Sequence, residues 1–459
     1  MSLSETIAVD LSGVPVARLR AFRVAEVARY TDARPLSRAA EAPDFLNGVP
    51  MHWMRDWPTP YPLIVDRAQG ARITDIDGHA LDDFCLGDTG SMFGHSPAPV
   101  ARAIRAQAGR GLTYMLPTQA ALAAGRALTA TFGDFRWQIA TTATDANRFA
   151  LRIARAVTGR PKVLVFNGCY HGTVDDAMVT LDGGRTVNRP GLVGQITDLS
   201  TLAVVAEFND LAGVAALLAQ GDVAAVLTEP VMTNSCMVLP EPGFLDGLRD
   251  LTHAHGALLI IDETHTQSTG HGGYSRVHGL DPDIFVVGKC VAGGLPTAVW
   301  GLRPAVADRF ATYDAARAPG HSGMGTTLSA NPLQFAALLA TLTEVATPAA
   351  FARMDAGAAR LADGLARAIA DHAAPWHVAR VGARVEFICA PGPLRNGSDA
   401  ARAHAPEVEQ AVHLGLLNRG SLIAPFHNMM LVSPVTTRAQ IDRLITNFRA
   451  VLAVLFAKD

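Results

Sequence analysis

Short apolar runs that alternate with alanine-rich stretches are the feature that most constrains the fold of this 459-residue chain. From about Val100 the runs are strand-length and apolar at consecutive positions, which is typical of strands buried on both faces of a sheet. They read WQIAT, KVLVF, AVVAEF, AAVLTEP, GALLIIDE, DIFVVGK and TAVWGL, and a helix is predicted over 145–158. This alternation predicts an α/β fold with a mostly parallel sheet covered by helices.

The extent of this alternation predicts a large domain over residues 100–328. Residues 1–99 form an N-terminal arm, expected to be irregular over its first 60 or so residues, and part of a smaller domain. That part includes a hairpin around Asp77-Gly78. A long Ala/Leu-rich helical region opens residues 329–459, which also hold a strand-like ARVEFICA and a last helix near 437–456. The smaller domain is therefore expected to be α+β and to combine both ends of the chain.

Composition excludes several classes of protein. About 49% of the residues are hydrophobic and 18% are charged, so a sizeable core can form and global disorder is excluded. The net charge of −3 argues against a nucleic-acid or anionic-membrane binder. No signal peptide or membrane-spanning run is visible, which predicts a cytoplasmic protein. The five cysteines are dispersed, which predicts neither a disulfide framework nor a metal site; they are Cys85, Cys169, Cys236, Cys290 and Cys389.

Two charged residues follow apolar runs directly. In mostly parallel sheets, ligands bind at the carboxyl ends of the strands. Lys289 follows DIFVVG, and a partly desolvated lysine there is a usable amine nucleophile; alternatively, its head reaches past the strand to solvent. Asp262 follows LLII, where it could accept a hydrogen bond from a pyridinium N–H or cap the next segment.

Other strand-end residues each have two interpretations. Thr142-Ala143-Thr144 lies between a strand and a helix and makes either an anion cradle or an ordinary helix cap. Tyr170 could stack on a flat ring or be a core tyrosine. His171 and His265 are individually read as structural histidines. Together with Lys289 and Asp262, these residues supply the parts that pyridoxal phosphate (PLP) needs.

In order and spacing, these motifs resemble the class III aminotransferases of PLP fold type I. The branch is the one similar to glutamate-1-semialdehyde aminotransferases, which includes D-phenylglycine and β-phenylalanine aminotransferases. The resemblance runs from about Tyr61 to the C-terminus. Its strongest pieces are Gly-Cys-Tyr-His-Gly at 168–172, Glu-Pro at 229–230, Asn234, Asp-Glu at 262–263, Gly-Lys at 288–289, Gly-Gly-Leu-Pro at 293–296 and Thr-Leu-Ser-Ala-Asn-Pro at 327–332.

The resemblance implies pyridoxal 5'-phosphate as the cofactor. Lys289 would carry it as a Schiff base (the internal aldimine), and Asp262 would pair with the pyridine nitrogen. The other implied cofactor contacts are Tyr170 on the ring face, Ala143 and Thr144 at the phosphate, Asn234 near the ring hydroxyl, and Thr327 at the phosphate of the neighbouring subunit. An obligate homodimer with shared active sites is therefore implied, acting on a small-molecule amino donor and keto acceptor.

The sequence also departs from the family pattern. The phosphate turn has Ala143 where the family usually has glycine, which questions how closely the backbone approaches the phosphate. Thr264 stands where many members have valine. Asn428 falls about where the aminomutases have an active-site glutamate, and residues 182–185 replace their glycine/serine-rich gating stretch. The last two differences favour a transaminase over an aminomutase.

An amino-acid substrate needs a partner for its carboxylate, and arginine matches that group best. Arg55 in the N-terminal arm and Arg384 in the C-terminal lobe are the two candidates; the alternative for each is a surface ion pair, with Asp56 or Glu386. Trp53, with its neighbours in the arm, could line a pocket for an aromatic or bulky side chain, or simply pack the arm.

The predicted function is an aminotransferase that moves an amino group between an amino acid and a keto acid with ping-pong kinetics. Amino acids with apolar or aromatic side chains, including D- and β-amino acids, are the expected donors. One alternative keeps the cofactor but isomerises the substrate, as an aminomutase or racemase. Another is a non-catalytic α/β binding protein, which would show no absorbance from a lysine-bound cofactor.

Overall fold

The computed structural model describes residues 11–40, 42–425 and 427–457. It divides into two compact units, each with its own core. Unit 1 comprises Met1–Ser96, Ala350–Leu394 and Arg402–Asp459, and unit 2 comprises Pro97–Ala349 and Arg395–Ala401. Unit 2 thus extends beyond residue 328, where the large domain was predicted to end. The extension follows from packing, because helix α11 (Pro332–Ala340) lies against α4 (Ala98–Ala108) and α5 (Gln119–Phe132).

A seven-stranded sheet forms the centre of unit 2, with the strand order β4-β12-β11-β10-β9-β5-β8. Strands β8, β5, β9, β10 and β11 pair in parallel, whereas β12 is antiparallel to both of its neighbours. The strands are β4 (Arg136–Ala140), β5 (Lys162–Phe166), β8 (Ala203–Ala206), β9 (Val223–Thr228), β10 (Leu258–Asp262), β11 (Ile284–Val287) and β12 (Ala298–Leu302). The predicted α/β fold with a mostly parallel sheet is confirmed, and each predicted strand of this region is present.

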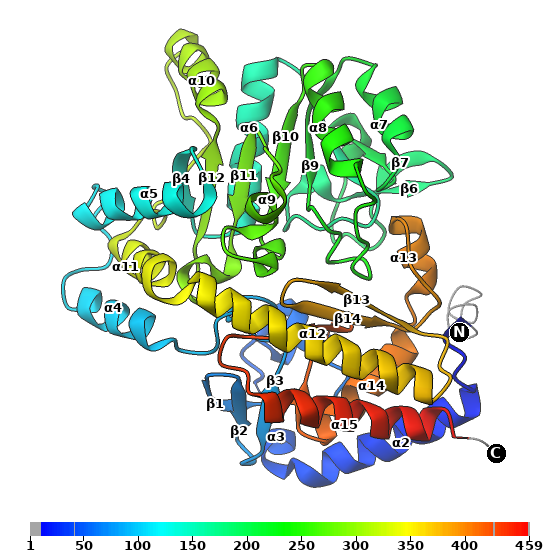
Figure 1. Ribbon diagram of the computed structural model, residues 1–459. Coiled ribbons are helices and arrows are strands. Elements are labelled where there is room, and N and C mark those ends of the chain that lie inside the picture. Colours follow the sequence, from blue (N-terminus) through cyan, green and yellow to red (C-terminus); the bar gives the residue numbers. More distant parts are fainter. Residues whose placement is uncertain (1–10, 41, 426, 458–459) are drawn as a thin grey trace. The chain divides into compact units, whose positions relative to one another are not determined.

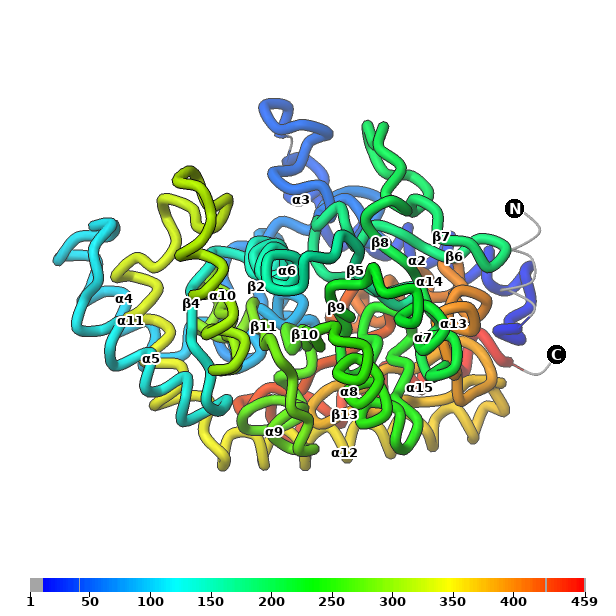
Figure 2. The backbone as a smooth tube through the Cα atoms, turned by 90° about the horizontal axis from the view of Figure 1, so that it is seen from above, coloured from blue at the N-terminus to red at the C-terminus, as the bar shows by residue number. Residues whose placement is uncertain are grey.

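Both faces of this sheet are buried, as its apolar runs predict. Ile284 and Val286 of β11 face a core that includes α6 (Ala143–Thr158), while Phe285 and Val287 face a second core that includes α5 and α11. Figure 2 shows α6 on one side of β9, β10 and β11, with α8 and α9 on the other. The other α-helices around this sheet are α7 (Leu211–Leu218), α8 (Phe244–Ala254), α9 (Gly273–His278) and α10 (Pro304–Ala316). A small hairpin, β6 (Val179–Asp182) with β7 (Arg185–Asn188), lies between β5 and β8 in the chain.

Unit 1 combines both ends of the chain around two small sheets (Figure 1). Their strands are β1 (Val65–Gln69), β2 (Arg72–Asp75), β3 (Ala80–Asp83) and β15 (Ser421–Leu422) in one sheet, and β13 (His377–Val381), β14 (Arg384–Ile388) and β16 (Met429–Leu431) in the other. Apolar side chains of the helices α2 (Val16–Ala33), α12 (Pro348–Asp371), α14 (Pro406–Asn418) and α15 (Arg438–Leu455) fill its core. The predicted hairpin around Asp77-Gly78 is confirmed, since β2 and β3 pair in antiparallel fashion. The chain also forms α13 (Gly397–Ala403).

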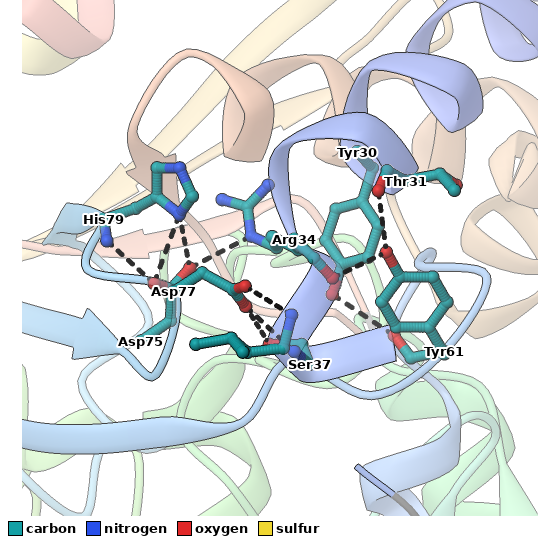
Figure 3. Close-up of polar contacts among 9 residues, drawn as sticks. Tyr30, Thr31, Arg34, Ser37, Tyr61, Asp75, Asp77 and His79 are labelled. Carbon is teal, nitrogen blue, oxygen red and sulfur yellow. Dashed lines mark hydrogen bonds and ion pairs between the residues drawn. The ribbon is translucent and has the colours of Figure 1, made fainter. Parts of the chain in front are cut away.

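The expectation of an irregular N-terminal arm is wrong for α2 and α3 (Pro35–Ala39). Leu19, Phe22 and Tyr30 bury one face of α2, a helical spacing that the polar residues between them obscure in the sequence. The end of α2 is tied to the hairpin: Arg34 forms a buried ion pair with Asp75 at 3.0 Å (Figure 3). These tertiary contacts, rather than a strong local pattern, hold the arm in place.

Among the described residues, no single helix is long and apolar enough to cross a membrane, although one bent pair, Pro332–Val345 with Pro348–Asp371, meets the length and composition test together.

Candidate active site

Asp262 and Lys289 come from neighbouring parallel strands of unit 2. Asp262 is the last residue of β10, where it pairs in register with Val286 of β11, and Lys289 follows the end of β11. Asp262 is buried and Lys289 is half-buried. Lys289 has a φ of 49°, a left-handed conformation that costs a lysine on the order of 1 kcal/mol or more and that tends to occur at functional sites. The sheet therefore brings the predicted amine and acid to the same edge.

Three donors hold the Asp262 carboxylate. The Asn147 amide donates to Oδ2 at 2.8 Å, His171 Nδ1 lies 3.1 Å from the same oxygen, and the Thr264 N–H donates to Oδ1 at 3.0 Å. Burial alone would raise the pKa of Asp262, but the hydrogen bond and charge of His171 with the other donors lower it to about 2. Burial likewise opposes the charged form of His171, yet its hydrogen bond to Asp262 raises the histidine pKa to about 10. Asp262 is thus a carboxylate at neutral pH, as a partner of a protonated ring nitrogen must be.

The first turn of α6 lies against the residues next to Lys289. A Cβ built on Gly288 would sit 2.9 Å from the Ala143 Cβ and 3.4 Å from the Ala143 nitrogen, so glycine is required by close approach. The Thr142 hydroxyl caps the helix by accepting from Asp145 N at 3.1 Å. Backbone N–H groups at a helix start lack helical acceptors and favour anions, so the N–H groups of Ala143 and Thr144 suit a phosphate.

The Gly-Cys-Tyr-His-Gly turn closes over the same helix end. Thr173 N donates to Thr144 Oγ1 at 3.2 Å, and Gly172 lies so close to Thr144 that a Cβ there would overlap the hydroxyl. At the other end of the turn, Ser235 Oγ donates to the Gly168 carbonyl at 2.6 Å. Tyr170, half-buried, is held between these two anchored ends.

Asn234 lies on the loop that follows β9. Its amide donates to Glu229 Oε1 at 3.3 Å, and the Thr233 hydroxyl donates to the other oxygen of Glu229. Burial raises the pKa of Glu229 to about 7, while the positive charge of His171 acts to lower it. The adjacent Ser235 is hydrogen-bonded to the turn that carries Tyr170. This bond places Asn234 near the cluster of residues around Asp262.

Three buried polar atoms around Asp262 have no hydrogen-bond partner among the described residues: Asn147 Oδ1, His171 Nε2 and Thr264 Oγ1. Such orphans are rare in folded proteins and mark places where a further group belongs. A strand-end amine, a carboxylate kept charged and an anion-binding helix start are the donor set that PLP requires, so the residues present fit this cofactor. The sequence holds only three lysines, Lys162, Lys289 and Lys458, and Lys162 is paired with Asp222 at 2.8 Å.

The structure does not bring every predicted residue to this cluster. Thr327 is exposed on a turn before α11, where its expected role at a neighbouring subunit stays a prediction. Trp53 and Arg55 lie in unit 1, exposed on the short helix η2 (His52–Arg55). Arg384 is fully buried in unit 1 and donates to the Thr89 hydroxyl at 2.7 Å, so a surface ion pair is the wrong interpretation of that residue.

Sequence reasoning missed two functional contacts and undervalued a third. Asn147 lies one helical turn beyond Ala143 and reaches Asp262; a polar residue on the apolar face of a predicted helix is the signal that could have revealed it. His171 was read as structural, but it is the main charge partner of Asp262. His265 Nε2 lies 2.7 Å from Lys289 Nζ, a contact that no local pattern announces.

A cavity of about 990 Å³ lies elsewhere on unit 2. Two of the arginines that line it have partners: Arg155 pairs with Asp176 at 2.6 Å, and Arg160 donates to the carbonyls of Val223 and His255. None of the predicted site residues lines it, so it is not the candidate active site.

A family model for class-III aminotransferases matches residues 54–452, most of the chain. The chain belongs to the class-III aminotransferase family. The resemblance drawn from the sequence motifs is thereby confirmed, and so is an enzyme of this fold.

Individual members of this family are similar over nearly the whole chain. A glutamate-1-semialdehyde 2,1-aminomutase of Desulfitobacterium hafniense is 34% identical over 402 residues, covering 86% of this chain and 91% of that protein. The crystal structure of a glutamate-1-semialdehyde-aminomutase from Pseudomonas aeruginosa PAO1 has a TM-score of 0.94 and 47% identity, covering 96% of this chain and all of that one. A variant of the Pseudomonas protein has been solved in complex with PMP, which agrees with the cofactor expected for a member of this family.

A β-phenylalanine aminotransferase from Variovorax paradoxus is a further structural neighbour, with a TM-score of 0.82 and 26% identity over 94% of this chain and 97% of that one. The chain thus resembles both aminomutases and transaminases of its family, and the aminomutases more strongly. This ranking favours the outcome that the sequence analysis placed second.

Proposed function

We propose that this protein is a PLP-dependent enzyme that transfers an amino group, with Lys289 as the residue that binds the cofactor. The observation that carries the proposal is the placement of Lys289 and Asp262 at the carboxyl ends of two paired parallel strands, next to the first turn of α6. The likeness to the Pseudomonas protein, whose variant binds PMP, supports the same cofactor here.

PLP supplies an aldehyde that captures amines and a protonated ring that withdraws electrons from the carbon bearing the captured nitrogen. Asp262 keeps a negative charge beside the ring nitrogen, and His171 and Asn147 hold that carboxylate in place. Ala143 and Thr144 offer backbone N–H groups to the phosphate. Tyr170 would cover a face of the ring, and Asn234 would lie toward its hydroxyl. Freed by a substrate amine, the Lys289 amine would take a proton from the substrate carbon and return it at another position.

The first candidate for the overall reaction is an aminomutase, because the curated relatives and the structural neighbour at 47% identity carry that name. In this mode the amino group moves between neighbouring carbons of one molecule, and no second substrate is consumed.

The second candidate is an aminotransferase that acts between an amino acid and a keto acid. It is favoured by Asn428, which stands where an aminomutase glutamate is expected. Asn428 is buried, and its side-chain oxygen accepts a hydrogen bond from His413 Nε2 at 2.9 Å. The different stretch at 182–185 and the likeness to the Variovorax aminotransferase point the same way. Arg55, Arg384 and Trp53 are the proposed substrate contacts for either mode.

Product analysis separates the two modes. The holoenzyme is incubated with glutamate-1-semialdehyde alone, and separately with a panel of α-, β- and D-amino donors with and without a keto acid. An aminomutase converts the single substrate to its isomer, whereas an aminotransferase loses its visible cofactor absorbance with a donor and regains it with an acceptor. Lys289→Ala abolishes either activity; an unchanged activity in this variant, or no cofactor absorbance in the wild type, contradicts the whole proposal.

A further inference from the structure

His265 contacts Lys289, and neither the sequence pattern nor the family resemblance predicts this contact. Its Nε2 lies 2.7 Å from Lys289 Nζ, a short hydrogen-bond distance, and the histidine is only 4% exposed. The contact is tertiary, because His265 precedes the short helix η5 (Thr266–Thr269) after β10, whereas Lys289 follows β11. The pairing of these strands therefore fixes the imidazole beside the amine.

Hydrogen-bond chemistry limits what this contact can be. A lysine ammonium has three donors and no acceptor, so next to it the imidazole Nε2 must be unprotonated. Two positive charges 2.7 Å apart would repel strongly, so the geometry favours a neutral imidazole beside the ammonium. The imidazole is thus the acceptor whenever Lys289 is charged.

The charged groups around His265 are held by other partners. Asp262 accepts from Asn147, His171 and Thr264, as described above. Glu263 accepts from the Thr266 hydroxyl at 2.7 Å and from Tyr274 N at 2.9 Å. Tyr274 belongs to α9, which packs on η5, and His271 lies in the turn before it; burial raises the pKa of Tyr274 and lowers that of His271, so both are neutral at pH 7.

We propose that His265 is a positioning residue that orients the Lys289 amine and stabilises the ammonium formed when Lys289 takes a proton from the substrate carbon. This inference rests on the proposed function. A neutral lysine amine has two N–H donors and one lone pair; with one donor fixed on His265, the lone pair can be aimed at the substrate. When the carbon–hydrogen bond breaks and the proton moves to Nζ, the positive charge that develops there lies 2.7 Å from an acceptor nitrogen already in place.

Two substitutions distinguish the hydrogen bond to Lys289 from the ability of the imidazole to titrate. His265→Gln offers an amide oxygen to Nζ but cannot titrate, and His265→Leu removes both properties. We expect kcat to fall about tenfold in His265→Gln and about 100-fold or more in His265→Leu, with a larger kinetic isotope effect for an α-deuterated substrate. The acidic limb of the wild-type pH–kcat profile, where imidazole protonation removes the acceptor, should be absent in His265→Gln. His278→Gln, at the exposed end of α9, is the matched control and should behave as wild type.

A measurement without turnover completes the test. Apo-enzyme is mixed with PLP, the rise of visible absorbance is followed, and the product is reduced with borohydride and mapped by mass spectrometry. Because the chain has only three lysines, modification at Lys289 is read unambiguously. Both His265 variants should still modify Lys289, but at a rate several-fold below that of wild type and of His278→Gln.

The outcomes are distinct. Wild-type rates, isotope effect and pH profile in both His265 variants would overturn the role of His265 while leaving the proposed function intact. A wild-type apo-enzyme that does not take PLP onto Lys289 would instead contradict the proposed function itself. Should His265→Leu fail to fold, His265→Gln decides the question alone, since a purely structural histidine would not carry the acidic limb.

Discussion

At the scale of single residues, the site depends on a buried ion pair between Asp262 and His171. A buried carboxylate is costly unless it is both paired and hydrogen-bonded, and here Asn147 and Thr264 supply the remaining bonds. The pair needs no change of protonation in the physiological range, because the pKa of Asp262 is lowered to about 2 and that of His171 raised to about 10. The carboxylate that we propose as the partner of the ring nitrogen therefore stays negatively charged across this pH range.

Asp262→Asn should lower kcat by about 10²–10³-fold. Loss of one preorganised electrostatic contact to developing charge typically lowers kcat by about 10²–10³-fold. Removing one member of a buried pair should also destabilise the fold, by about 3–5 kcal/mol. Steady-state kinetics and the cofactor absorbance check this prediction.

The same pair has a consequence for stability against pH. The contribution of Asp262 is present above its ordinary pKa of 3.8 and is lost as pH falls through 2, whereas that of His171 is full below 6.5 and is lost as pH rises through 10. The wild-type free energy of unfolding should thus decline between pH 6.5 and 10, and Asp262→Asn should flatten that decline. The free energy of unfolding is measured by urea titration at each pH. An equal decline with pH in both proteins would contradict the ion pair.

At the scale of elements, the start of α6 packs closely against the residues that follow β11, at the contact between Ala143 and Gly288. Ala143 stands where the family pattern has glycine, and its methyl group is accommodated by Gly288 rather than displacing the helix from the strand end. The Ala143 side chain is thus accommodated because the facing residue at the end of the strand, Gly288, has none.

Gly288→Ala should therefore destabilise the protein by about 1–3 kcal/mol and speed the loss of cofactor on dialysis, because the new Cβ would lie 2.9 Å from that of Ala143. The double variant with Ala143→Gly should recover most of both losses. Chemical denaturation and residual cofactor absorbance measure them.

Gly125→Ala is the matched control for this prediction. Gly125 lies in α5 with open space where its Cβ would be, so this change should be neutral or stabilise by about 0.4–1 kcal/mol. If the double variant of Gly288→Ala with Ala143→Gly were no more stable than Gly288→Ala alone, the proposed contact between α6 and the end of β11 would be contradicted.

At the scale of the whole molecule, unit 2 exposes an apolar segment between α4 and α5. Met115 is 72% exposed and Leu116 70%, with Leu112 and Tyr114 beside them in the chain; Leu328, adjacent to Thr327, is 61% exposed. Contiguous exposed apolar residues mark an interaction surface, and two-fold pairing with a second copy is the commonest use of one. We therefore propose that this segment contributes to the homodimer that the family resemblance implies.

The wild-type protein should have the mass of a dimer in sedimentation or light scattering at micromolar concentration. Met115→Asp combined with Leu116→Asp should weaken association by about 10²–10⁴-fold, because burial of each such side chain contributes about 1.5–3 kcal/mol. Val24→Asp is the control, since Val24 is 71% exposed on α2 of unit 1. A monomeric wild type, or a double variant that stays dimeric, would contradict this surface.

The central sheet and the candidate amine and acid, Lys289 and Asp262, could be predicted from the sequence. Strands buried on both faces must be apolar throughout, so β5, β9, β10 and β11 were readable from the chain alone. A charged residue directly after such a strand is conspicuous, which made Lys289 and Asp262 candidates; the family resemblance then implied their roles. The helix α2 was missed because its burial rests on a few spaced side chains and on contacts with distant segments.

The hydrogen-bond partners of Asp262 and Lys289 could not be predicted from the sequence and depend on the tertiary structure. Asn147, His171 and His265 come from a helix, a turn and a strand end, and they meet Asp262 or Lys289 through strand pairing and helix packing. A hydrogen bond between side chains far apart in sequence has no local signature, because its energy depends on distance in space. The sequence therefore predicted the candidate groups for the chemistry, and the fold decided which side chains contact them and keep Asp262 charged.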